Sequence, residues 1–139
     1  MVLADTSAWF LSRRPDAVPA KQVLDELLLA AQIAICDMVR FELVYSSRNA
    51  DEMAAVLTNL EALFDCPVGK PQWDRALTVY WRLAQQGGAH HRSVGHQDLL
   101  IAAAAEAAGA TVLHYDENFD RIAAITGQPT SWIVPRGSL

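Results

Sequence analysis

The sequence TVLHYD at residues 111–116 decides the fold that this chain is expected to adopt, because a run of β-branched and aromatic residues ends there at an acid. The sequence VLAD at residues 2–5 has the same plan, a short apolar run followed directly by an aspartate. Short apolar runs without polar alternation are typical of strands buried on both faces, as in parallel sheets. Residues 32–35 and 132–134 are predicted to be further strands, the last at a sheet edge beside Pro135.

Helical patterns lie between these strands. The predicted helices are residues 19–31, 37–45, 49–64, 71–86 and 96–108. Asp37 is expected to cap the second helix, and Asn49 with Glu52 forms a capping-box pair at the start of the third. Gly87 and Gly88 end the fourth helix, and Gly109 ends the fifth. Strands that alternate with helices predict an α/β fold, a three-layer α/β/α sandwich around a central, mostly parallel sheet. Residues 1–139 are expected to form one domain, because no linker, internal repeat or low-complexity tract interrupts them.

The charge balance excludes the binding of nucleic acid by bulk charge. The chain contains sixteen Asp and Glu residues against eleven Lys and Arg residues, which gives a formal net charge of −5. This is the wrong sign for holding a polyanion by overall attraction, so any nucleic-acid role has to rest on local features.

Neither membrane insertion nor secretion is expected. The longest apolar run, residues 99–105, is far shorter than the roughly 18 residues that a membrane span needs. Asp5 interrupts anything that resembles a signal peptide. Cys36 and Cys66 form no CxxC pair and lack the density of a disulfide scaffold. We therefore expect a cytoplasmic protein whose two cysteines are reduced core residues.

Asp5 and Asp116 each follow a predicted strand directly. In open parallel sheets, ligands bind beyond the carboxyl ends of the strands, where loops converge. A single aspartate in such a place is usually a turn residue or a helix cap. Two aspartates in equivalent places favour a shared site at that edge of the sheet.

Two further acids lie on helix faces that are expected to turn inward. Glu42 shares its face with apolar residues such as Val39, where a solvated glutamate would not be placed. Asp98 opens a helix and shares its face with Ile101 and Ala102. The helix macrodipole also favours an acid in a first turn, so a purely structural role for Asp98 stays open.

Four carboxylates that are brought together need compensation. Two unit charges about 4 Å apart repel by about 4 kcal/mol at an effective dielectric constant near 20, whereas a whole domain is stable by only about 5 to 15 kcal/mol. Either protons neutralise such a cluster through raised pKa values, or hard divalent cations do. Ligand sets made only of oxygen favour magnesium or manganese, and metal held in this way suits phosphodiester hydrolysis.

The ordered set of motifs resembles a known family. Asp5-Thr6-Ser7 after the first strand, Glu42 within a helix, DLLIAA at residues 98–103 and DENF at residues 116–119 are similar in order and spacing to the PIN-domain ribonucleases. The size and spacing are most similar to the VapC toxins of VapBC toxin–antitoxin pairs, and the similarity spans nearly the whole chain. The resemblance implies a PIN-like fold and a catalytic, metal-binding quartet at positions 5, 42, 98 and 116.

The resemblance also implies an activity and partners. It implies Mg²⁺- or Mn²⁺-dependent endonuclease action on RNA, often transfer or ribosomal RNA, by homodimers that a cognate VapB-like antitoxin silences. The family that the chain resembles often has a further aspartate at the position where this chain has Asn118. An asparagine adds no charge, so we expect Asn118 to hydrogen-bond around the site rather than to bind metal directly.

Four other residues are candidates for contacts with substrate. Thr6 or Ser7 is expected either to bind a metal-bound water or phosphate oxygen, or to cap the helix that follows. Arg13 and Arg92 lie near the predicted acidic residues in sequence and are candidates for phosphate contacts, although each alone is typical of a solvated surface charge.

Three histidines suggest an alternative site. His90, His91 and His96 raise the possibility of a zinc site or of imidazole acid–base catalysis, but their spacing fits no metal-binding pattern. They follow Gly87 and Gly88, so we interpret them as solvated loop residues, with His96 near enough to Asp98 to touch a substrate phosphate.

Some acidic and aromatic residues have simpler interpretations. Residues 116–127 begin like an EF-hand loop but lack its glycine and its final glutamate, and Asp120 is expected to pair with Arg121 or to cap the last helix. Trp9, Phe10, Trp73 and Trp81 could stack on bases, but their helical spacing favours packing in the core or in a dimer.

The leading hypothesis is therefore a metal-dependent endoribonuclease toxin. A catalytically silent PIN-like module that binds nucleic acid or acts as a scaffold is the alternative, and a hydrolase of small phosphate esters is a third possibility.

Overall fold

The sheet is fully parallel. A computed structural model describes residues 1–88 and 90–139, without the side chain of His90. Its five strands lie in the order β3-β2-β1-β4-β5, and every neighbouring pair is parallel. In chain order the strands are β1 (Val2–Ala4), β2 (Ile33–Ile35), β3 (Phe64–Asp65), β4 (Thr111–His114) and β5 (Thr130–Trp132).

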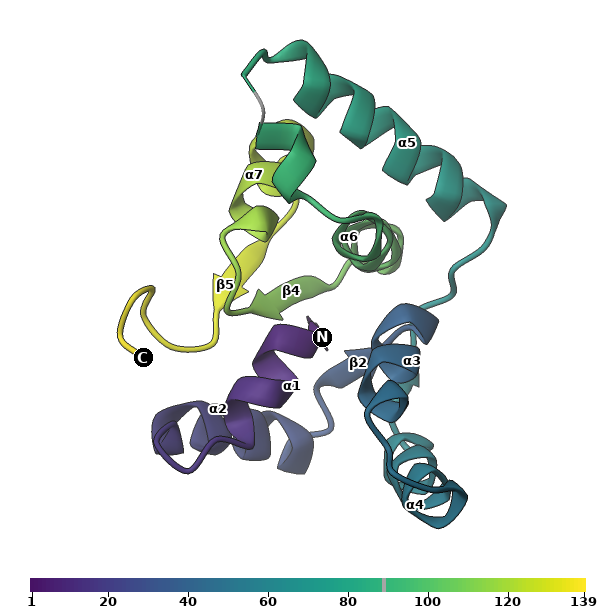
Figure 1. The fold of residues 1–139 in the computed structure, drawn as a ribbon, viewed down its shortest axis with the longest axis vertical. Coiled ribbons are helices and arrows are strands. Elements are labelled where there is room, and N and C mark those ends of the chain that lie inside the picture. Colours follow the sequence, from purple (N-terminus) through teal and green to yellow (C-terminus); the bar gives the residue numbers. More distant parts are fainter. Residues whose placement is uncertain (89) are drawn as a thin grey trace.

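Helices cover both faces of this sheet. They are α1 (Thr6–Ser12), α2 (Val18–Leu29), α3 (Asp37–Tyr45), α4 (Ala50–Leu60), α5 (Lys70–Gln85), the 3-10 turn η1 (His90–Ser93), α6 (His96–Ala108) and α7 (Asn118–Thr126). In Figure 1, α1 and α2 lie below β4, whereas α5, α6 and α7 lie above it. The predicted three-layer α/β/α sandwich is therefore confirmed.

Local signals explain where several helices begin and end. The side chain of Asn49 accepts a hydrogen bond from the backbone N–H of Glu52 at 2.9 Å, so the predicted cap of α4 is present. Gly109 ends α6 with a φ of +68°, a left-handed conformation that glycine adopts without strain. The predicted cap of α3 was wrong. Asp37 is the first residue of that helix, and its carboxylate pairs with Arg40 instead.

The sheet differs from the expected one at both edges. Helix α4 ends at Leu60 and not at residue 64, because residues 64 and 65 form the short edge strand β3 beside β2. The last strand lies two residues earlier than predicted. Its pairing with β4 stops at His114, where β4 itself ends, so Trp132 is the last paired residue of β5.

The core lies on both faces of the sheet, against α6 on one face and against α1 and α2 on the other. Residues 99–105 of α6 are all buried, and their alanines let this helix pack closely on its neighbours.

Cys36 and Cys66 are buried and free, as predicted, and burial raises the pKa of the Cys36 thiol to about 11. Within residues 1–88 and 90–139, no helix is long and apolar enough to cross a membrane.

Candidate functional site

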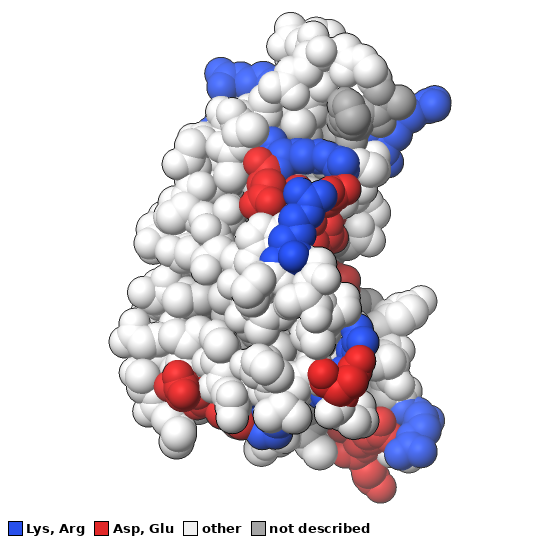
Figure 2. Space-filling view, turned by 90° about the vertical axis from the view of Figure 1, so that its left-hand side faces the viewer, with Lys and Arg blue, Asp and Glu red and all other residues white. Residues whose placement is uncertain are grey.

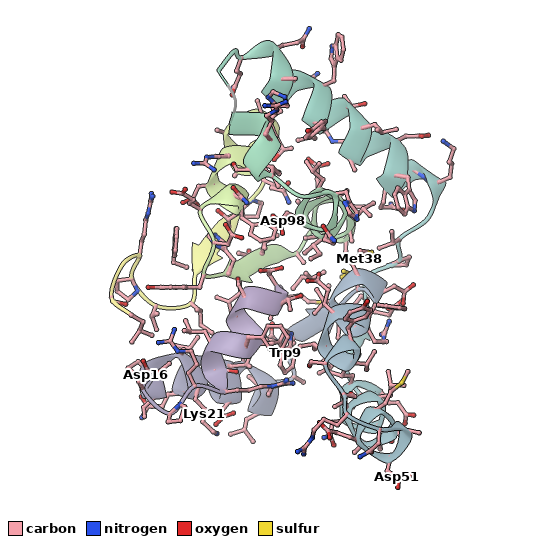
Figure 3. All side chains as sticks on the ribbon, in the orientation of Figure 1. Trp9, Asp16, Lys21, Met38, Asp51 and Asp98 are labelled. Atoms are coloured by element: carbon pink, nitrogen blue, oxygen red, sulfur yellow. The ribbon has the colours of Figure 1, made fainter. Side chains whose placement is uncertain are left out.

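Four acids come from four separate elements. Asp5 follows β1, Asp116 lies two residues after β4, Asp98 is in the first turn of α6, and Glu42 lies in α3. Strands β1 and β4 are neighbours, and the backbone N–H of Asp5 donates to the carbonyl of Leu113 at 2.8 Å. Asp5 and Asp116 therefore lie at the same edge of the sheet. Figure 3 labels Asp98 near the centre of the molecule, at the start of α6.

Asp5 is a buried carboxylate held by Ser7. One of its oxygens accepts hydrogen bonds from the Ser7 backbone N–H at 3.0 Å and from the Ser7 hydroxyl at 2.6 Å. The same hydroxyl accepts from the backbone N–H of Tyr115 at 2.9 Å. Burial raises the pKa of Asp5, the bonds from Ser7 lower it, and the charge of Asp116 raises it further. Ser7 therefore joins α1 to the end of β4, and Asp5 itself is the cap of α1.

The charges of all three other acids affect the pKa of Asp98. Burial and the charges of Asp5, Asp116 and Glu42 raise its pKa to about 7, and the side chain of Asn118 partly offsets this rise. A carboxyl group with this pKa is half protonated at neutral pH. The structure therefore brings the four predicted acids into one electrostatic unit, with Asp98 most strongly affected.

Glu42 and Thr6 leave oxygen atoms unpartnered in the same region. Glu42 Oε1 and Thr6 Oγ1 are both buried and have no hydrogen-bond partner. Burial and the charge of Asp5 raise the pKa of Glu42. The Thr6 hydroxyl and His96 lower it, although the hydroxyl makes no hydrogen bond to the carboxylate. Buried polar atoms without partners are rare in folded proteins and commonly mark the place of a water or an ion.

Asn118 connects the acids to η1. Its side-chain N–H group donates to the backbone carbonyl of Ser93 at 2.7 Å and to Asp98 Oδ2 at 3.3 Å. Its carbonyl oxygen accepts from Arg121 at 2.9 Å. Its backbone N–H donates to Asp116 Oδ1 at 2.9 Å. Asn118 thus contacts two members of the quartet.

Sequence reasoning missed the residues that support this arrangement. Arg121 holds Asn118 and pairs with Glu117 at 2.9 Å, which corrects the prediction that it pairs with Asp120. Asp120 instead accepts from the indole N–H of Trp132 at 3.0 Å. Neighbours on a helix point apart, whereas residues three or four apart meet, so the spacing of Arg121 from positions 117 and 118 was the available signal.

The buried His114 contacts the backbone of Asp116. Its Nδ1 atom accepts a hydrogen bond from the Asp116 backbone N–H at 3.1 Å. The imidazole ring packs against Phe119 and Trp132, and burial lowers its pKa. Desolvation disfavours the charged imidazolium, so His114 holds the Asp116 backbone as a neutral ring.

The predicted cations are exposed. The Arg13 guanidinium lies 5.6 Å from the centre of the Phe10 ring, and Arg92 lies in η1. Figure 2 shows basic and acidic side chains beside one another, with no continuous basic surface on the face in view. A hollow interrupts the right-hand outline in that view, and acidic side chains reach it. Any contact with phosphate therefore depends on individual exposed cations.

The histidines do not form a site of their own. His91 is partly buried with its ring edge-on to Tyr80, so the interpretation as a solvated loop residue was wrong for this position. His96 is exposed at the start of α6, and the side chain of His90 lies outside the described residues. Among the residues that the structure describes, no three His, Cys, Asp or Glu side chains are placed closely enough to hold a metal ion as they stand.

Comparison with known proteins identifies the family. The family model of the PIN domain matches residues 2–125. Ribonuclease VapC18 of Mycobacterium tuberculosis is 53% identical over 97% of this chain and 96% of its own length. Ribonuclease VapC51 of the same organism is 39% identical over 99% of this chain and 96% of its own length. The crystal structure of VapBC2 from Rickettsia felis bound to a promoter DNA fragment has the same fold, with a TM-score of 0.70, 23% identity, and coverage of 95% of this chain and 98% of that chain. This chain therefore belongs to the PIN-domain family and, within it, to the VapC ribonucleases.

Proposed function

We propose that this protein is an endoribonuclease toxin that hydrolyses RNA with Mg²⁺ or Mn²⁺ held by Asp5, Glu42, Asp98 and Asp116. The observation that carries the proposal is the environment of Asp98, where burial together with the charges of the other three acids raises its pKa to about 7. A cluster of this kind needs positive charge to be ionised together. The names of the most similar relatives, ribonucleases VapC18 and VapC51, support RNA as the substrate.

The donor atoms fit a hard divalent cation. All four proposed ligands are carboxylates, and oxygen ligands favour magnesium and manganese over softer metals. Glu42 Oε1 and Thr6 Oγ1 are buried without partners, so ligand capacity is available beside the cluster. When bound, the metal would activate a water for attack on the phosphodiester and stabilise the departing oxygen.

The other residues of the site orient these acids and the RNA. Ser7 fixes the carboxylate of Asp5 through two hydrogen bonds, and Asn118 contacts both Asp98 and Asp116. Thr6 is placed to contact a water or a phosphate oxygen with its unpartnered hydroxyl. Arg13 and Arg92 are exposed, and we assign them to phosphate contacts that position the strand.

The protein acts within a toxin–antitoxin pair and in the cytoplasm, where its RNA substrate lies. Several solved structures with this fold are VapBC complexes, some of them bound to DNA, which supports a VapB-like antitoxin as partner. Large apolar side chains are exposed on two helices, Phe41 and Tyr45 on α3 and Met53 on α4. Exposed apolar faces of this kind suit a homodimer and an antitoxin contact.

Cleavage of cellular RNA tests this function. Purified protein, freed of any partner, is incubated with total RNA in Mg²⁺, in Mn²⁺ and in chelator, beside an Asp98→Asn variant. We expect discrete fragments only with metal and only from the wild type. Binding of RNA without any cleavage would favour the silent nucleic-acid-binding module. Turnover of a generic aryl phosphate without RNA cleavage would favour a hydrolase of small phosphate esters.

A further inference from the structure

An aromatic cavity opens at the start of α6, the helix that carries Asp98. It lies between α5 and α6 and has a volume of about 380 Å³. Three aromatic rings line it, those of Trp73, Tyr80 and His96, together with the aliphatic side chains of Leu77 and Leu99. We call it the α5–α6 pocket. Its lining is mainly apolar and aromatic, so it suits a flat, uncharged ring system.

The pocket and one of the acids, Asp98, share the first turn of α6. His96 and Leu99 line the pocket, and Asp98 lies between them in sequence. Gln97, which follows His96, lines a second cavity together with Glu42. A ligand with a phosphate group near the acids can therefore place an adjoining ring in the pocket.

We propose that the α5–α6 pocket binds one base of the RNA next to the phosphate that is cleaved, with the base stacked on Trp73 and Tyr80. This inference rests on the proposed function, because it assigns part of the substrate of the same site. Aromatic side chains are the usual platform for unpaired bases in RNA-binding proteins. The mainly apolar lining contacts the faces of a base and offers few groups to its edges, so the pocket tolerates different bases.

The two platform rings differ in their contacts and exposure. The edge-to-face contact with His91, whose ring centre lies 5.6 Å away, braces Tyr80. Trp73 is 48% exposed at the rim, where it can close over a bound ring. One ring is therefore packed against a neighbour and the other is open to solvent, an arrangement that admits a base.

Stacking also supplies an attraction that the overall charge does not. The chain has a formal net charge of −5, and the acids repel the RNA backbone unless metal is bound. Base stacking on an aromatic side chain is worth about 1 to 3 kcal/mol per base and is independent of net charge. The pocket thus compensates for weak electrostatic affinity at the place where the strand has to be held.

A pair of tryptophans on one helix allows a matched test. Trp73 and Trp81 both lie in α5 and both are exposed, but only Trp73 lines the pocket. The probe is a fluorescein-labelled single-stranded RNA of twelve nucleotides, and its affinity is measured by anisotropy in chelator. We expect Trp73→Ala to weaken binding about tenfold, Trp73→Phe to restore most of it, and Trp81→Ala to leave it nearly unchanged. Far-ultraviolet circular dichroism confirms that each variant is folded.

Photocrosslinking places the base without relying on a mutation. The same RNA with 4-thiouridine substitutions is irradiated on the wild-type protein, and adducts are mapped by mass spectrometry. Adducts at Trp73, Tyr80 or His96 support the proposal. Equal binding by the Trp73→Ala and Trp81→Ala variants, with adducts elsewhere, would overturn it while RNA cleavage by the wild type left the proposed function standing.

Sedimentation separates a base from a second copy of the chain. If Trp73→Ala converts a dimer to a monomer and leaves RNA binding unchanged, a partner subunit covers the pocket and the proposal is wrong. If the wild type neither binds nor cleaves any RNA, the proposed function fails together with this inference. A dimer that persists in Trp73→Ala while RNA affinity falls supports the pocket as a base-binding site.

Discussion

The side-chain amide of Asn118 donates to the carboxylate of Asp98 at 3.3 Å and, from the same nitrogen, to the carbonyl of Ser93 at 2.7 Å. Both acceptors need a donor at this position. An aspartate has none at neutral pH, so this pair of hydrogen bonds requires an amide at position 118.

Substitution of Asn118 by aspartate should destabilise the metal-free protein. A carboxylate at this position faces the Asp98 carboxylate and the Ser93 carbonyl, so it replaces two hydrogen bonds by repulsion. We expect Asn118→Asp to lower the free energy of unfolding by about 1 to 3 kcal/mol, and to be less stable in chelator than Asn118→Ala. Urea unfolding measures the free energy of unfolding of both variants and of the wild type. Saturating Mg²⁺ should reduce the difference in stability between the two variants. An Asn118→Asp protein that is as stable as wild type in chelator would contradict the assigned hydrogen bonds.

The pKa of Asp98 predicts a pH-dependent stability. Its folded-state pKa of about 7 lies above the ordinary value of 3.8, so the folded state binds more protons than the unfolded state between these values. The stability that a protonated Asp98 contributes is fully present below pH 4 and is lost as the pH rises through 7. The pKa difference is equivalent to at most about 4 kcal/mol.

A comparison with Asp98→Asn isolates this contribution, because the variant keeps every other titrating group, including the buried His114. In chelator the variant should gain stability relative to wild type as the pH rises from 5 to about 8. Thermal unfolding at several pH values measures the difference. A difference that does not change with pH would show that Asp98 titrates normally.

Divalent metal should stabilise the wild type more strongly at high pH. Protons and metal compete for the same carboxylates, so metal binding has to release the proton that Asp98 retains near neutral pH. Mg²⁺ at about a hundred times its dissociation constant should add about 2.7 kcal/mol to the stability. The shift in melting temperature should be larger at pH 8 than at pH 6 and small in Asp98→Asn. Equal shifts in the two proteins would remove Asp98 from the metal site.

Removal of the Ser7 hydroxyl should loosen Asp5. Without it, Asp5 loses the 2.6 Å hydrogen bond and the backbone N–H of Tyr115 loses its acceptor. We expect Ser7→Ala to lower stability by about 1 to 3 kcal/mol and to weaken metal binding by about 10- to 100-fold. Ser131→Ala is the matched control, because Ser131 is exposed on β5. A Ser7→Ala protein with wild-type metal affinity would refute the role given to this hydroxyl.

The strand ends could be predicted from the sequence because their signal is local. Asp5 and Asp116 directly follow short apolar runs, and the inward face of Glu42 follows from its apolar helix neighbours. Helix α6 was predicted to its last residue because Gly109 marks its end. In each case the decisive residues lie within a few positions of one another.

The supporting contacts could not be predicted, because they join distant parts of the chain. Asn118 meets Ser93 across 25 residues, and Tyr115 meets Ser7 across 108. Strand β3 escaped prediction because it has only two residues, both exposed, and carries no alternating pattern. Helical spacing alone also could not distinguish Trp73 from Trp81, since only the packing of α6 against α5 creates the pocket.

The chemistry of the fragment ends tests the acidic metal site most directly. A single RNA that the wild type cuts is incubated with Mg²⁺ or with chelator, with wild type or Asp98→Asn, and the ends of each fragment are determined. Hydrolysis by metal at the carboxylates predicts 5′-phosphate and 3′-hydroxyl ends that appear only with wild type and metal. Cyclic phosphate ends that form equally in chelator, or in the Asp98→Asn variant, would contradict the carboxylate mechanism and transfer the chemistry to other groups, such as His91 or His96.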